Sequence, residues 1–197
     1  SNRWLTFAKA VQPRHYLMVL KHPLRNDPQH IVTLRLQSGV GDFCQQITAR
    51  LSKRKASPLL KKLQKAERVC KEILTGHMSR SETHLTEPAI AHLLTKMLPK
   101  SSGLFVGNSM PIRELNLFAS AKGESVRITA NRGASGIDGN IATAAGFAKA
   151  SGLAACTALI GDLTFLYDIN SLTFLQGIKK PFVLIVINNN GGSIFSF

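Results

Sequence analysis

The chain has 197 residues, of which 44% are hydrophobic and 18% charged, and its formal net charge is +14. These proportions allow a packed core and exclude wholesale disorder, and no apolar run reaches the roughly 18 residues of a membrane-spanning helix. Three cysteines without CxxC spacing, Cys44, Cys70 and Cys156, argue against a disulfide framework or a structural zinc site. Because the N-terminus shows no signal-peptide pattern, we expect a cytoplasmic protein that is not inserted in a membrane.

Residues 1–80 predict the first of two regions. Strand-like apolar runs stand at 16–20 and 31–36, on either side of a segment rich in turn residues. A helical and basic pattern follows over 42–73, and the polar residues 75–86 predict a linker. We therefore expect part of an α/β domain here.

Residues 81–197 predict a regular alternation of helices and strands. The first helix begins at Thr86, a preferred N-cap residue, with Pro88 in its first turn. Apolar strands are predicted at 104–106, 125–129, 154–160 and 182–187, and further helices at 111–121, 141–150 and 165–176. Continuous apolar strands between amphipathic helices predict an α/β fold: a parallel sheet with helices on both faces.

The positive charge is concentrated between Arg50 and Lys71, where nine basic residues are relieved only by Glu67 and Glu72. Such a block can attract nucleic acid or another anionic surface. Aromatic residues for base stacking and a nucleic-acid-binding motif are both missing from it. We expect a solvated helix face and no nucleic-acid partner, with a basic, non-catalytic binding module as the alternative.

Small and polar residues follow four of the predicted strands, at 107–109, 131–139, 161–162 and 188–192. Ligands of open α/β sheets bind beyond the carboxyl ends of the strands. Asp162 and Asn189 are separated by 26 residues, enough for a helix and a strand, so they should lie at neighbouring strand ends. Their oxygens are donors of the kind that Mg²⁺ takes, and nearby glycines allow close approach of a diphosphate. The alternative for Gly161-Asp162 alone is a turn, and the alternative for residues 188–192 alone is a loop with left-handed residues.

Gly161-Asp162 with Asn189 resembles the diphosphate and Mg²⁺ motif of thiamine-diphosphate enzymes. The segments 107–113, 131–139 and 188–196 narrow the resemblance to the 2-succinyl-5-enolpyruvyl-6-hydroxy-3-cyclohexene-1-carboxylate synthases of menaquinone biosynthesis. Leu163 supports this narrower choice, since most members of the superfamily have Gly there. Another decarboxylase or carboligase of the superfamily is the alternative.

The resemblance implies a fold, cofactors and site residues. Residues 1–80 would be the C-terminal part of a middle domain, and residues 81–197 a diphosphate domain with the thiamine-diphosphate-binding fold. Thiamine diphosphate would bind with Mg²⁺ or Mn²⁺, the metal being held by the side chains of Asp162 and Asn189 and the backbone oxygen of Gly191. The cofactor pocket would also include Gly161, Leu163, Ile194, Phe195 and Ile137, the last supporting a bent cofactor. The substrate carboxylates would be held by Arg3, Ser109, Arg113 and Arg132.

The family reaction decarboxylates 2-oxoglutarate and adds the resulting succinyl semialdehyde carbanion to isochorismate, which makes the enzyme a transferase (carboligase). The glutamate that activates the cofactor lies in a separate N-terminal pyrimidine-binding domain of the family, and the active site forms between subunits. We therefore expect residues 1–197 to be a fragment, cut at both ends, with no catalytic residue of its own and no activity alone. The full-length protein is expected to be a homo-oligomer, a dimer or a tetramer.

Overall fold

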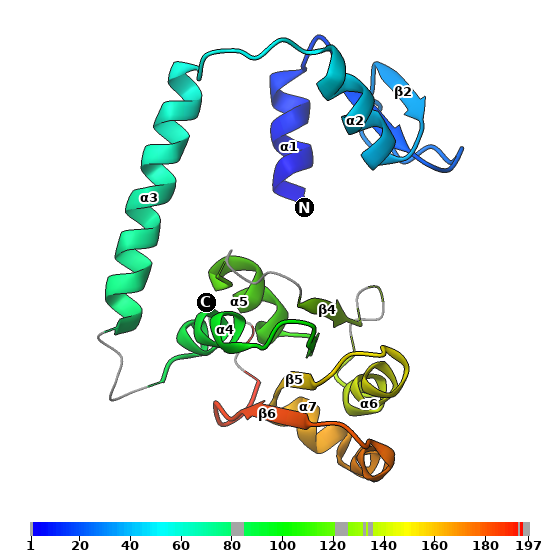
Figure 1. The fold of residues 1–197 in the computed structure, drawn as a ribbon, viewed down its shortest axis with the longest axis vertical. Helices are drawn as coiled ribbons and strands as arrows, with labels where there is room; N and C mark the ends of the chain where they lie inside the picture. The colour runs from blue at the N-terminus through cyan, green and yellow to red at the C-terminus, as the bar shows by residue number, and fades with distance from the viewer. Residues whose placement is uncertain are drawn as a thin grey trace. The chain divides into compact units, whose positions relative to one another are not determined.

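The computed structural model describes residues 2–79, 85–120, 126–131, 133, 136–192 and 194. The chain divides into two compact units, residues 1–65 and 66–197, and each is described by itself. Figure 1 labels their helices and strands along the chain. Among the described residues, the helices are too short or too polar to cross a membrane.

The described residues of the first unit form two complete helices, the start of a third and a small parallel sheet. Helix α1 (Asn2–Val11) precedes strand β1 (Leu17–Leu20), and strand β2 (Leu34–Gln37) leads into helix α2 (Val40–Arg50). Strands β1 and β2 are parallel and paired along their whole lengths. The first predicted strand is confirmed, whereas the second begins three residues later than predicted.

The late start of β2 has a local cause in Asp27. Its carboxylate accepts hydrogen bonds from the backbone N–H groups of Ile31, at 3.2 Å, and Val32, at 3.1 Å. These N–H groups are satisfied by a side chain instead of a strand ladder, so the segment forms a turn. Burial by itself raises the pKa of Asp27, but these hydrogen bonds and the nearby Arg25 guanidinium outweigh it and lower the pKa.

The helical pattern predicted over 42–73 is confirmed in part, because two helices with a non-helical segment between them occupy this region. Helix α2 ends at Arg50, and α3 (Pro58–Ser79) begins after a non-helical segment. A residue before proline is disfavoured in a helix, whereas proline itself fits the first helical turn, so α3 begins at Pro58. The Ser57 hydroxyl oxygen accepts the Leu60 N–H at 3.1 Å in this first turn. Because α3 continues to Ser79, the first residues of the predicted linker are helical. This helix crosses the division between the two units.

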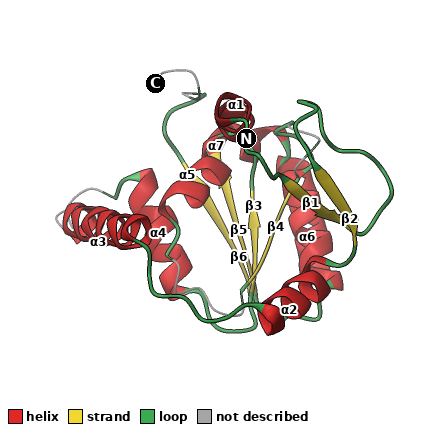
Figure 2. Cartoon of the chain, turned by 90° about the horizontal axis from the view of Figure 1, so that it is seen from above, coloured by secondary structure: helices red, strands yellow, loops and turns green. Residues whose placement is uncertain are grey.

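The second unit is a parallel sheet covered by helices. Its strands have the order β4-β3-β5-β6. The elements are α4 (Glu87–Met97), β3 (Gly103–Val106), α5 (Met110–Phe118), β4 (Arg127–Ala130), α6 (Asn140–Ala150), β5 (Cys156–Gly161), α7 (Asp162–Tyr167), the 3-10 helix η1 (Ile169–Gly177) and β6 (Phe182–Ile187). Figure 2 shows the strands between α4 and α5 on one side and α6 on the other. The predicted fold class, a parallel α/β sheet with helices on both faces, is confirmed.

One helix of this unit begins where it was predicted to begin, and another begins earlier. Helix α4 has the predicted N-cap, since the Thr86 hydroxyl oxygen accepts the Ala89 N–H at 3.4 Å. The helix predicted over 165–176 instead starts at Asp162 and changes to a 3-10 helix after Asp168. Asp162 therefore stands in the first turn of α7, not in a loop before the helix.

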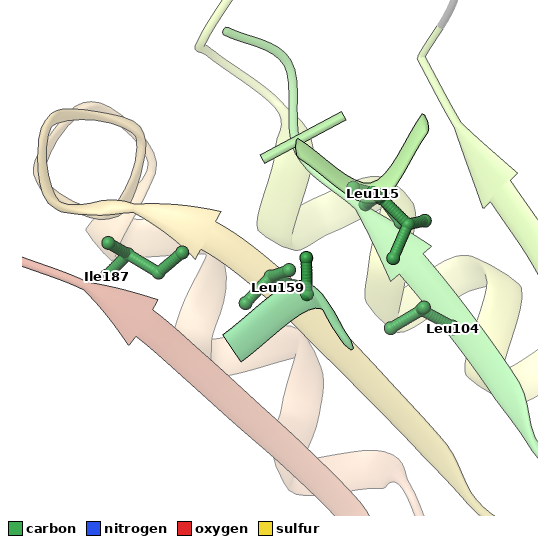
Figure 3. Packing of buried hydrophobic residues seen from close by; sticks show 6 residues of the cluster. Leu104, Leu115, Leu159 and Ile187 are labelled. Atoms are coloured by element: carbon green, nitrogen blue, oxygen red, sulfur yellow. The ribbon is translucent and has the colours of Figure 1, made fainter. Parts of the chain in front are cut away.

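Separate apolar clusters cover the two faces of the sheet. On one face, Leu115 of α5 lies over strand residues of β3, β5 and β6, as Figure 3 shows for Leu104, Leu159 and Ile187. On the other face, Ile141 and Ala144 of α6 pack against Phe105, Ala158 and Ile160. Most of these side chains are fully buried. This packing fixes the strands, and with them the loops that leave their carboxyl ends.

Candidate functional site

The carboxyl ends of β5 and β6 lie side by side. The two strands are parallel, and Gly161, the last residue of β5, stands opposite Ile187, the last residue of β6. The chain continues from these ends directly into Asp162 and toward Asn189. The predicted placement of these two residues at neighbouring strand ends is therefore confirmed.

The Asp162 carboxylate is held in place by backbone groups. Its Oδ1 accepts the N–H of Leu163 at 2.7 Å, and its Oδ2 accepts the N–H of Gly191 at 2.9 Å. Gly191 has a φ of +114°, a conformation that favours glycine. The loop after β6 is thus bound to the end of β5 through one half-buried carboxylate.

A cavity of about 180 Å³ opens at this edge of the sheet. Its wall contains eight of the predicted site residues: Ser109, Ile137, Gly161, Asp162, Leu163, Asn189, Gly191 and Ile194. They come from the last residue of β5 and from the segments that follow β3, β4, β5 and β6. The structure therefore gathers at one cavity the residues that the sequence places after four strands.

Glycines leave room along one side of this cavity. A Cβ atom added to Gly161 or to Gly191 would have no atom within 4 Å. One added to Gly192 would come to 3.3 Å from Leu163 Cδ1. The backbone at Gly161 and Gly191 therefore borders open space, and a ligand can approach its polar groups closely.

Ser109 precedes α5 in a strained conformation. Its φ of 72° and ψ of −130° are unusual for a residue with a side chain, and its hydroxyl makes no capping hydrogen bond to the helix. Arg113, one turn further on, is exposed and donates from Nη1 to the Ser109 carbonyl at 2.6 Å. Ser109 lines the cavity, whereas Arg113 does not.

The remaining predicted residues are Arg3, Arg132 and Phe195. Arg3 is an exposed residue of α1 in the first unit. Arg132 and Phe195 lie outside the described residues.

The loop that carries Ile137 is fixed by two asparagines. Asn108 Nδ2 donates to the Gly136 carbonyl at 2.6 Å, and Asn140 Nδ2 donates to the Asp138 carbonyl at 3.1 Å. The carbonyls on either side of Ile137 are thus held, and its side chain stays in the cavity wall. These asparagines position the loop without lining the cavity themselves.

Asp168 holds the start of α6, the helix that follows the loop with Ile137. This buried carboxylate accepts the N–H groups of Ile141, at 2.5 Å, and Ala142, at 3.2 Å, in the first turn of α6. It also accepts the Ser171 hydroxyl at 2.6 Å. A negative charge at a helix N-terminus is favourable, and here it joins α6 to η1. No local sequence pattern singles out Asp168, because Ile141 and Ala142 are 27 and 26 positions away along the chain.

Two glutamates that are not among the predicted site residues lie at or beside the cavity. Glu87, in the first turn of α4, is part of its wall, and its Oε1 accepts the Nδ2–H of Asn189 at 3.0 Å. Glu114 of α5 is only 5% exposed. Burial, a hydrogen bond with Glu87 and repulsion from its charge raise the pKa of Glu114 to about 7. Helical spacing could have flagged Glu114, which follows the buried Pro111 by one turn.

The donor set at the cavity fits a hard cation. Asp162 offers a carboxylate, Asn189 an amide oxygen and Gly191 a backbone carbonyl, and Mg²⁺ and Mn²⁺ favour such oxygen ligands. Within the described ranges, no three His, Cys, Asp or Glu side chains gather as a metal site of their own. A cation held here would therefore complete its coordination with ligand oxygens and water, as Mg²⁺ does beside phosphates.

A parallel α/β sheet with a cavity at adjacent strand ends is typical of ligand-binding α/β proteins. A family model described as "Middle domain of thiamine pyrophosphate" matches residues 1–106, and the chain belongs to this family.

Individual relatives indicate a narrower class of protein than the family model does. The chain is similar to the 2-succinyl-5-enolpyruvyl-6-hydroxy-3-cyclohexene-1-carboxylate synthases of Rubrobacter xylanophilus, 40% identical over 197 residues, and Chlorobium phaeobacteroides, 43% identical over 188. These alignments cover 100% and 94% of this chain but 34% and 32% of the relatives. "Protein PHYLLO, chloroplastic" of Arabidopsis thaliana is 37% identical over 201 positions, covering 93% of this chain and 12% of that protein. The resemblance predicted from the sequence is confirmed, and the chain spans about a third of the length of the two synthases.

Proposed function

We propose that this chain supplies the diphosphate- and cation-binding part of a thiamine-diphosphate-dependent synthase of the kind named above. The observation that carries the proposal is the hydrogen bond from the Gly191 N–H to Asp162 at 2.9 Å. This hydrogen bond joins the segments that follow β5 and β6, which were predicted to hold the cation. Asn189 lines the cavity at the same place. Similarity to the synthases over the whole chain supports the same assignment.

In this proposal, each part of the cavity wall has a role. Asp162, Asn189 and the Gly191 carbonyl hold Mg²⁺ against the cofactor diphosphate, and the bare backbone at Gly161 admits the phosphate oxygens. Leu163, Ile194 and Ile137 supply apolar contacts for the cofactor rings. Thiamine diphosphate, when bound, supplies the electron sink that decarboxylation of a 2-oxo acid requires.

The proposed substrates are 2-oxoglutarate and isochorismate, joined in menaquinone biosynthesis. Both carry more than one carboxylate, and arginine forks bind carboxylates bidentately. We assign Arg3, Arg113 and Arg132 to this task, with the Ser109 hydroxyl at the cavity wall as a further donor. The contact of Arg113 with the Ser109 carbonyl uses one of the five N–H donors of a guanidinium.

The test is cofactor binding by the Asp162→Ala variant. Calorimetric titration of the full-length protein with thiamine diphosphate should show tight binding with Mg²⁺ and a loss of at least about 100-fold in Asp162→Ala, since this variant removes both a ligand and the hydrogen-bond acceptor that holds the β6 loop. Asp42→Ala removes an exposed carboxylate of the first unit and should leave binding unchanged. Equal affinities for the wild type and Asp162→Ala would disprove the assignment.

We also propose that the polypeptide of residues 1–197, expressed by itself, does not turn over 2-oxoglutarate and isochorismate. The family resemblance places the activating glutamate in another domain, and a positioned acid or base contributes on the order of 10²–10⁴-fold. The assay is isochorismate consumption with 2-oxoglutarate, thiamine diphosphate and Mg²⁺. Turnover close to that of one of the synthase relatives would contradict this proposal.

A further inference from the structure

Glu87 contacts a proposed cation ligand from the cavity wall. It stands in the first turn of α4, behind the N-cap Thr86, and its side chain is half-buried. Its Oε1 accepts the Nδ2–H of Asn189 at 3.0 Å, although the two residues are 102 positions apart in the chain. Helix α4 and the loop after β6 therefore meet at this hydrogen bond.

The contact decides which way the Asn189 amide faces. An amide carries a donor nitrogen and an acceptor oxygen on opposite sides of one carbon, and only the oxygen can bind a cation. A carboxylate accepts hydrogen bonds and donates none, so it selects the nitrogen. With Nδ2 bound to Glu87, Oδ1 is directed to the opposite side of the amide by covalent geometry alone.

Glu114, a residue of α5, is a hydrogen-bond partner of Glu87. It is buried, hydrogen-bonded to Glu87, and has its pKa raised to about 7. In its protonated form, Glu114 donates a hydrogen bond to Glu87 and leaves Glu87 an acceptor toward Asn189. Glu114 Oε2 is buried with no hydrogen-bond partner among the described residues, so the pair carries an energetic cost. Two adjacent carboxyl groups, one of which has a buried oxygen without a hydrogen-bond partner in the described part of the chain, are not explained by a gain in stability, so we expect their role to lie in the site.

We infer that Glu87 is a positioning residue, which orients the Asn189 amide so that its oxygen is presented to the cation. The inference rests on the proposed function, because it takes Asn189 as a cation ligand. It adds to that function a residue on a different element, α4, which acts on the cation through Asn189. Partners that orient metal ligands in this way typically change metal affinity by about 10–100-fold when removed.

The experiment compares two variants of nearly equal size, Glu87→Met and Glu87→Gln. Both remove the negative charge, but only Gln keeps an oxygen that can accept the Asn189 Nδ2–H. Calorimetric titration with Mg²⁺ at saturating thiamine diphosphate should show a loss of about 10-fold or more for Glu87→Met. Glu87→Gln should lose no more than about threefold, since a two-way amide contact at worst halves the correctly oriented population. Glu67→Gln, which removes an exposed charge on α3, should match the wild type.

The outcomes separate this inference from the proposed function. Equal losses for Met and Gln would mean that Glu87 acts through charge alone, and no loss for either would mean that it does not act on the cation; both overturn the inference. If Asp162→Ala still abolishes binding in those cases, the proposed function stands. A wild-type protein that binds no Mg²⁺ with thiamine diphosphate overturns both.

A second measurement covers the case in which Glu87→Met does not fold. Hydrogen exchange of the Asn189 side-chain amide, followed by NMR on asparagine-labelled wild-type protein, should be at least about 10-fold slower than that of the exposed Asn116. Exchange at the rate of Asn116 would overturn the orienting contact itself.

Discussion

The two units differ in how far their strands are buried. In the second unit, every residue of β3 and five of the six residues of β5 are buried, between helices on both faces of the sheet. In the first unit, β1 and β2 contain no buried residue, and neither does α2. A two-stranded sheet is marginal by itself, whereas a larger covered sheet can hold its loops in fixed positions. The cavity lies on the sheet that has the core, where precise placement of side chains is possible.

The largest expected effect tests this difference in burial directly. Leu159→Ala, in β5, removes a side chain that is 0% exposed, and Leu34→Ala, in β2, removes one that is 50% exposed. We expect the first to lower the free energy of unfolding by about 2–5 kcal/mol and the second by less than about 1 kcal/mol. Urea unfolding of both variants provides the measurement. Similar losses would show that the first unit depends on burial as strongly as the second.

The next effect concerns the buried cap of α6. Asp168→Ala leaves the N–H groups of Ile141 and Ala142 and the Ser171 hydroxyl without their acceptor, which should cost about 2 kcal/mol. Asp168→Asn keeps one acceptor oxygen and should cost less. Thermal unfolding compares the two, and hydrogen exchange in the first turn of α6 should rise in step. A stable Asp168→Ala variant would mean that water replaces the carboxylate.

The same contrast in burial explains what the sequence could predict. Strand β6 was predicted with its observed limits, 182–187, because a continuous apolar run between turn residues has one favourable place in a covered sheet. The meeting of Asp162 with Asn189 was predicted because parallel strands joined through a helix place their carboxyl ends at one edge. These features follow from local pattern and topology.

Other features depend on contacts that no local pattern records. The start of β2 was wrong because Asp27 takes two backbone N–H groups that the apolar run alone would give to a sheet. The contact of Glu87 with Glu114 was missed because it joins two helices, α4 and α5, whose packing only the fold determines. Arg113 was expected at the pocket, and its exposed position against the Ser109 carbonyl depends on a side-chain conformation that spacing does not fix.

A smaller effect concerns the pH dependence of the buried acid. The pKa of Glu114 is raised from 4.5 to about 7 by burial and by Glu87, so between these values the folded protein holds more protons than the unfolded one. The contribution of Glu114 to stability therefore falls as pH rises through this range. Glu114→Gln does not titrate and should gain on the order of 1 kcal/mol relative to the wild type between pH 5 and pH 8. Urea unfolding at both pH values measures it; an unchanged difference would place the Glu114 pKa near its ordinary value.

The smallest effect is expected at the basic helix α3, which bears on the alternative of a basic binding module. Lys61, Lys62 and Lys65 are exposed, and replacing all three by Gln should change cofactor affinity by no more than a few fold. It should also change little in retention on an immobilised oligonucleotide, because a solvated face without stacking aromatics has no built site for bases. A protein that binds nucleic acid through this helix would behave differently: its retention would fall steeply with salt, and the triple variant would reproduce at low salt the loss that high salt causes in the wild type. That pattern would support the binding-module alternative, in which the charged helix and not the cavity of the second unit carries the function. Without that pattern, the positive charge of α3 is explained as a solvated helix face.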